Sequence, residues 1–148
     1  MMATQFRPML AGDVVQLGLQ ASQIAELEAF GEASIMGKGR QLAELGDAWT
    51  ASWGNRIVAC GGFLEQQAHE AVAWIALARE ICPAARVGVV RFAARMIDAA
   101  RYERLEALVD CDNERAVALA KFLGLRAVAL LRKKGADRRD QLLLERVV

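Results

Sequence analysis

The residues best suited to chemistry in this sequence are two arginines and a glycine that follow Pro83. Arg86, Gly88 and Arg91 stand where a run with apolar residues at helical spacing begins, so they would lie near a helix N-terminus. Unpaired backbone N–H groups at such an end attract anions, glycine permits close approach of a ligand, and arginine binds phosphate well. The segment is therefore a candidate phosphate site. The alternative, which we favour, is a solvated helix face.

Other residue types that often carry chemistry are scattered along the chain. His69 is the only histidine, and it falls in a polar stretch where a surface position is expected. It has no Cys or Asp cluster at metal-ligand spacing, so the sequence predicts no metal site. Cys60, Cys82 and Cys111 lack C-x-x-C spacing, which indicates free thiols in a reducing compartment. Nothing matches a nucleophile elbow, a P-loop or a dinucleotide fingerprint, so the catalytic residues stay unknown at this stage.

A mixed sheet with helices packed on it is expected to position these residues. Apolar residues at helical spacing predict helices over 14–19, 22–31, 89–100 and 113–123, with a short one near 41–45. Alternating or uncharged apolar runs predict strands at 48–53, 57–64, 71–78, 104–110, 128–131 and 142–147. Gly54-Asn55 predicts a tight hairpin between the first two strands. This order predicts one α/β (α+β) domain over residues 1–148. The last strand is expected at an edge of the sheet, where its apolar side chains would meet a partner.

Composition bounds the class of protein. The chain has 148 residues, of which 55% are hydrophobic, enough for one domain with its own core. The net charge of +1 lacks the strong basic excess that is usual in nucleic-acid binders. No uncharged apolar run has the length of a membrane helix, and the first ten residues lack a signal-peptide pattern. We therefore expect a cytoplasmic protein with no nucleic-acid or membrane partner.

Three segments of the sequence resemble parts of one known superfamily. They are Phe6-Arg7-Pro8 followed by Asp13, the hairpin at Gly54-Asn55, and Asn113-Glu114-Arg115-Ala116 with Leu123-Gly124-Leu125. The first two are similar to the first strand and turn and to the second and third strands of the GNAT superfamily of acyl-CoA-dependent N-acyltransferases. The third is similar to its asparagine–alanine–Leu-Gly-Phe signature. The resemblance covers nearly the whole chain and implies a mixed, mostly antiparallel sheet with helices on both faces.

Within that superfamily the sequence resembles a phage-associated branch of short GNAT-like proteins. The pieces that carry this likeness are Asp13, Ile24-Ala25-Glu26-Leu27-Glu28-Ala29, Ala48-Trp49, Ala59-Cys60-Gly61-Gly62, Val109-Asp110 and Leu123-Gly124. Some members resemble internal virion proteins, and many have no assigned activity. The likeness implies a phage-derived protein, virion-associated if it is phage-encoded, whose partner is a second copy in a homodimer or a phage virion protein.

The superfamily resemblance also implies where acetyl-CoA would bind. The family holds the cofactor pyrophosphate on a loop that reads Arg or Gln, two residues, Gly, one residue, then Gly or Ala. The two small positions fall here on Val89 and Arg91, and Gly88 is one place out of register. Leu77 lies on the strand that would pair with the pantetheine arm, and Asn113 matches a cofactor-contacting asparagine that is equally a helix N-cap. The implied cofactor-binding residues are Leu77, Arg86, Val87, Gly88, Val89, Val90, Arg91 and Asn113.

The proton-transfer groups of the family are incompletely matched. Its usual general acid, a tyrosine on the helix after the asparagine, is replaced by Ala120, and the only tyrosine is Tyr102. Loss of a positioned acid costs about 10²–10⁴-fold in rate. Candidates for the base are Glu65, Glu70 and Asp110.

Together, these departures predict a GNAT-like protein with a degenerate acetyl-CoA loop, little or no acetyltransferase activity, and a structural or interaction role. The sequence allows acetyl-CoA as a cofactor without requiring it. The alternative is an acetyl-CoA-dependent N-acetyltransferase that acts on an unknown amine substrate.

Overall fold

The computed structural model describes residues 2–17, 44, 47–134 and 138–148. The described elements, in chain order, are β1 (Thr4–Pro8), the 3-10 helix η1 (Val14–Leu17), β2 (Ala48–Trp53), β3 (Arg56–Gln67), β4 (Glu70–Leu77), α3 (Pro83–Ala99), β5 (Arg104–Asp110), α4 (Glu114–Phe122), β6 (Arg126–Leu131) and β7 (Gln141–Val147). The helices predicted over 22–31 and near 41–45 lie outside the described residues, apart from Glu44, which is helical. No helix in the described part of the chain is long and apolar enough to cross a membrane.

The strands form a seven-stranded sheet in the order β1-β2-β3-β4-β5-β7-β6. Neighbouring strands are antiparallel except β4 and β5, which run parallel. The predicted α/β class with a mixed, mostly antiparallel sheet is therefore confirmed. The prediction that the last strand lies at an edge is wrong, because β7 pairs with β5 on one side and with β6 on the other. An inner place explains its apolar sequence, and β6 is the edge strand on that side of the sheet.

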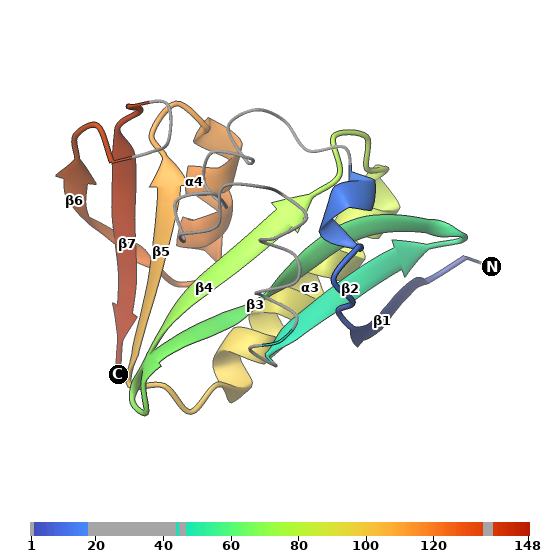
Figure 1. Ribbon diagram of the computed structural model, residues 1–148, viewed down its shortest axis with the longest axis horizontal. Helices are drawn as coiled ribbons and strands as arrows, with labels where there is room; N and C mark the ends of the chain where they lie inside the picture. Colours follow the sequence, from blue (N-terminus) through green and yellow to red (C-terminus); the bar gives the residue numbers. More distant parts are fainter. Residues whose placement is uncertain (1, 18–43, 45–46, 135–137) are drawn as a thin grey trace.

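Helices cover both faces of the sheet. Val14 of η1 packs in one cluster with Cys60 of β3, whereas Val89 of α3 packs in another with Ala59 of the same strand. Successive residues of a strand point to opposite faces, so η1 and α3 lie on opposite sides, and in Figure 1 α3 passes behind the sheet. β4 is covered on both faces, as its nearly uncharged sequence predicts.

The turn after β1 is held by a buried carboxylate, that of Asp13. It accepts hydrogen bonds from Arg7 at 2.7 and 3.0 Å, from the Leu10 N–H at 2.8 Å and from the Thr50 hydroxyl at 2.7 Å. Burial alone would raise the pKa of Asp13, but these bonds, led by the one from Arg7, outweigh it and lower that pKa below its usual value. The carboxylate therefore ties β1, the following turn and β2 together.

The parallel pair β4–β5 creates a gap in the sheet. Its ladder joins only three residues of each strand, Glu70, Ala71 and Val72 opposite Arg104, Leu105 and Glu106. Beyond these residues the two strands spread apart, as Figure 1 shows, and α4 lies beside β5 across the gap. The open end of this splay is formed by the carboxyl ends of two parallel strands, which is where ligands bind in many α/β sheets.

Candidate functional site

An apolar cleft occupies the splay between β4 and β5. Both strands line it, through Ala73, Trp74, Ile75, Ala107, Leu108 and Val109. α3 adds Met96 and Ile97, and α4 adds Ala120, so helices close the cleft on the α3 face of the sheet. The cavity volume is about 90 Å³, room for a few water molecules in this form. Its carbon-rich walls suit a thin, weakly polar ligand.

A second hollow, which we name the mouth pocket, lies at the open end of the splay. It brings together three residues predicted from the sequence, Leu77, Arg86 and Asn113. Arg79, just after β4, and Arg115, in the first turn of α4, line it as well. The mouth pocket and the cleft share lining residues, namely Ile75, Ala116 and Leu119. The two hollows are therefore adjacent, with the polar one outermost.

The mouth pocket is positively charged. Arg79 and Arg115 are exposed and Arg86 is half-buried, and none of them forms an ion pair with a described residue. α3 begins beside them with no side-chain cap at its N-terminus, and such an end favours negative charge. Guanidinium groups match the geometry of phosphate oxygens. This arrangement can bind a phosphate or pyrophosphate through side chains.

Asn113 has the capping role that was one of its two predicted roles. Its Oδ1 accepts a hydrogen bond from the Ala116 N–H at 3.2 Å, at the start of α4. The side-chain nitrogen of Asn113, Nδ2, donates to no side chain or carbonyl in the described part of the chain. Capping through the oxygen therefore leaves that nitrogen able to donate to a ligand in the mouth pocket.

The other predicted cofactor residues lie away from the mouth pocket. Val89 is fully buried against the sheet, and Val90 is half-buried. Val87, Gly88 and Arg91 line a shallow hollow beside β1 on another side of α3. A Cβ on Gly88 would lie 2.4 Å from the hydroxyl oxygen of Thr4, so this glycine allows close packing of α3 on β1.

The expected phosphate loop is helical here. α3 starts at Pro83, earlier than the spacing of apolar residues predicted, and so includes the whole segment from Arg86 to Arg91. Proline at the first turn is preorganised for a helix, and Ala85 is buried one turn before Val89, which extends the apolar stripe. Amides inside a helix bond to carbonyls of the preceding turn. Those of this segment are therefore committed to α3 rather than offered to an anion.

The chain's tyrosine lies in a third hollow, the outer groove, between α3 and the strands β1 to β3. Tyr102 donates to Glu65 at 3.1 Å and lies 3.4 Å from a carboxylate oxygen of Asp47. Burial and then the Glu65 contact raise the pKa of Tyr102 to about 12, so it stays protonated at neutral pH. Ala120, which the resemblance in sequence aligns with the general acid, lies in the wall of the cleft. Tyr102 is therefore held by carboxylates in a different hollow.

The three predicted base candidates differ in their distance from the mouth. Glu65 lies opposite Ala71, and Glu70 opposite Arg104, both where β4 and β5 are still paired. Asp110 ends β5 at the open end of the splay. Its carboxylate is 3.0 Å from the Arg139 guanidinium, an arrangement typical of a structural ion pair.

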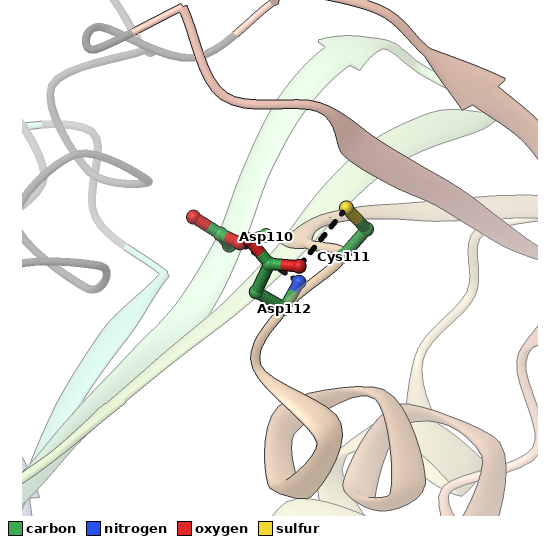
Figure 2. Close-up of side chains that lie close together, drawn as sticks. All are labelled: Asp110, Cys111 and Asp112. Carbon is green, nitrogen blue, oxygen red and sulfur yellow. Dashed lines mark hydrogen bonds between the residues drawn. The ribbon is translucent and has the colours of Figure 1, made fainter.

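Asp110, Cys111 and Asp112 form the group with the best ligand spacing for a metal in the described residues. Their ligand atoms lie within 4.8 Å of one another, and Figure 2 shows the three side chains with their mutual hydrogen bonds. Asp110 accepts from the Asp112 N–H at 2.9 Å, and burial followed by the nearby carboxylates raises the pKa of Cys111. A protonated thiol and a carboxylate paired with Arg139 are poor metal ligands. The group builds the turn into α4.

The remaining reactive side chains lie elsewhere. His69 is in the β3–β4 turn with 52% of its side chain exposed, so its predicted surface position is confirmed. Cys60, Cys82 and Cys111 are free thiols, as predicted, and Cys60 is buried in the core. Burial raises the pKa of Cys60 to about 12, which makes it unreactive.

Sequence reasoning missed Arg79 and Arg115. A signal was present, since Arg79 stands two residues after β4 and Arg115 stands two residues after the N-cap of α4. Residues just beyond the carboxyl ends of parallel strands converge on one edge of a sheet. Recognition of the β4–β5 pair as parallel would have placed both arginines at the mouth.

The chain matches solved structures of known proteins, but no family model and no curated sequence. Ard1 from Thermoplasma volcanium has a TM-score of 0.75 at 15% identity, over 99% of this chain and 98% of that one. A GNAT-family acetyltransferase from Bacillus anthracis has a TM-score of 0.67 at 11% identity, over 97% and 94%. yncA from Salmonella typhimurium, solved with its cofactor acetyl-CoA, has a TM-score of 0.67 at 13% identity, over 98% and 94%.

At these identities the likeness concerns the fold. It extends along nearly the full length of each chain. The phage-associated branch stays a prediction from sequence. This chain therefore has the GNAT fold of N-acetyltransferases.

Proposed function

We propose that this GNAT-fold chain binds a coenzyme A thioester, such as acetyl-CoA, in the splay, and has little or no acetyltransferase activity. Its role is then a structural or interaction one, in a virion if the chain is phage-encoded. Binding is supported by one observation: a positively charged mouth pocket lies next to an apolar cleft between β4 and β5. One neighbour in fold is a structure that holds acetyl-CoA.

The mouth pocket would hold the phosphate end of such a ligand. Arg79, Arg86 and Arg115 supply positive charge with no competing carboxylate bonded to them among the described residues. Side chains would replace the backbone amides that the helical segment has committed to α3. Each hydrogen bond to a charged group contributes about 1.5–3 kcal/mol, so a few arginines can offset the missing loop.

Acyl transfer is disfavoured by the groups around the cleft. A bound thioester would supply an activated acyl group, but an amine acceptor must also lose a proton and the leaving thiolate must gain one. The wall carries Ala120 where the family has its acid, and Tyr102 is hydrogen-bonded to Glu65 in the outer groove. Binding and transfer can therefore be separated in this chain.

Removal of the mouth arginines tests the binding proposal. Acetyl-CoA at 100 times its Kd is expected to stabilise the wild-type chain by about 2.7 kcal/mol, seen as a rise in melting temperature. A double variant, Arg86→Ala with Arg115→Ala, is expected to weaken binding by about tenfold or more. Arg91→Ala is the matched control, because Arg91 is an exposed arginine of α3 outside the mouth pocket. No melting shift at millimolar acetyl-CoA, or equal losses in both variants, would refute the proposal.

The transfer part has its own measurement. With acetyl-CoA and a panel of amines, release of free thiol is expected to run at the rate seen without protein. The acceptors should span small polyamines, free amino acids and peptide N-termini, because the substrate of an active form is unspecified. Thiol release that depends on an amine, saturates with it and falls in the Arg86→Ala, Arg115→Ala variant would establish the acetyltransferase alternative instead.

A further inference from the structure

We infer that the cleft accepts a medium-length fatty acyl chain in preference to an acetyl group. This inference rests on the proposed binding of a coenzyme A thioester and specifies which acyl group it carries. The evidence is the order of the three hollows, the chemistry of the cleft wall and the small side chains where the β4–β5 ladder ends.

The three hollows lie in series. The cleft shares Ile75, Ala116 and Leu119 with the mouth pocket. It shares a different set, Trp49, Phe63 and Met96, with the outer groove. A ligand whose phosphates sit at the arginines would therefore direct its other end toward these three large side chains, and the outer groove continues behind them.

The wall of the cleft offers carbon almost everywhere. Among its described lining residues, only the two tryptophans carry a polar side-chain atom. Trp74 is one of them, but it packs in the same cluster as Val14 of η1, on the opposite face of the sheet from α3. The walls therefore offer a ligand few hydrogen-bond partners, which suits methylene groups.

Small side chains leave room at the inner end of the cleft, where the β4–β5 ladder ends. Ala73 and Ala107 follow directly after the last paired residues of β4 and β5, and both line the cleft with Ala93. The inner wall beyond them is closed by Phe63 and Met96, and Met96 is 37% exposed toward the outer groove. Methionine is flexible and adapts to irregular apolar ligands. An acetyl group would leave this apolar surface uncovered, whereas a longer chain would cover it.

Titration calorimetry on the full chain tests the inference. Coenzyme A, acetyl-CoA and octanoyl-CoA are titrated separately, the last below its micelle concentration. Each buried methylene improves Kd by about fourfold, so octanoyl-CoA is expected to bind about tenfold tighter than acetyl-CoA or better, even with partial burial.

Variants of the cleft wall test whether the acyl chain of the ligand lies in the cleft. Ala73→Leu fills the inner end and is expected to lower octanoyl-CoA affinity by about tenfold more than it lowers acetyl-CoA affinity, so that the octanoyl preference is lost. Ala107→Leu is a second filler from the facing strand, should Ala73→Leu fail to fold. Ala118→Leu is the matched control, because Ala118 is exposed on α4.

Each outcome is decisive. Equal affinities for acetyl-CoA and octanoyl-CoA overturn the inference and leave coenzyme A binding intact. A preference for octanoyl-CoA that survives in both Ala73→Leu and Ala107→Leu also overturns it, since the acyl group of the ligand then lies outside the cleft. Absence of binding by all three compounds overturns the inference together with the proposed function.

Discussion

A Gly62→Ala variant is expected to lose about 3 kcal/mol or more of its free energy of unfolding. A Cβ at this position would lie 2.1 Å from the carbonyl oxygen of Asp47 and 2.8 Å from the Cα of Ala48. Both are backbone atoms at the start of β2, so rotation of a side chain cannot relieve the overlap. The carbonyl of Asp47 also accepts the Phe63 N–H at 2.9 Å, and a shift of either strand would strain that bond.

Urea denaturation of the two proteins measures the difference. Gly12→Ala is the matched control, because a Cβ on Gly12 meets nothing within 4 Å, and its change is expected to stay within about 0.5 kcal/mol. If Gly62→Ala proved as stable as this control, the close approach of β3 to the start of β2 would be wrong. Since Gly62 also lines the cleft, the same result would weaken the description of its inner end.

Replacement of Asp13 by alanine is expected to lower the free energy of unfolding by about 3 kcal/mol. Asp13 is 3% exposed, and its removal leaves the Thr50 hydroxyl, at 0% exposure, without its 2.7 Å acceptor. The Leu10 N–H loses its acceptor as well. Arg7 is 45% exposed, so water can solvate it and the loss stays below that of a fully buried pair.

The dependence of this loss on pH identifies its origin. The pKa of Asp13 is lower in the folded state, so its contribution is complete above the usual aspartate pKa of about 4 and is lost as pH falls through the lower folded value. The difference between wild type and Asp13→Ala is therefore expected to shrink below about pH 4. A difference that stays constant down to pH 2 would contradict a role for the ionised carboxylate. Asp98→Ala, on the exposed face of α3, serves as the control.

Most of the fold could be predicted from the sequence, because turns and helix ends are determined by the residues at those positions. Gly54 adopts a positive φ of 62° in the β2–β3 hairpin, as the Gly-Asn pair predicts. Asn113 caps α4 and Gly124 closes it at a φ of 97°, both predicted from residue type. Strand order is not local, which is why β7 was taken for an edge strand although it lies between β5 and β6.

The site was harder to predict from the sequence, because it depends on the residue at which α3 begins. Family spacing directed attention to the segment from Arg86 to Arg91, but the apolar stripe that begins at Ala85 extends α3 back to Pro83. Because residues 83–88 are also helical, Gly88 lies against Thr4, and the amides that a phosphate would use are committed to α3. Of the eight predicted cofactor residues, the mouth pocket retains Leu77, Arg86 and Asn113. It gains two arginines that only the three-dimensional arrangement brings there.

The short ladder between β4 and β5 also bears on how the molecule becomes ordered. It divides the sheet into two antiparallel blocks, β1 to β4 and β5 to β7, that meet through three residues of each strand. The β4–β5 ladder must close a loop that includes α3, and it joins fewer residues than any other pair of strands in the sheet. So few contacts offset little of the entropy lost when that loop closes. We expect each block to gain structure on its own, so that the ligand-binding splay is the last part of the protein to form and the first to open.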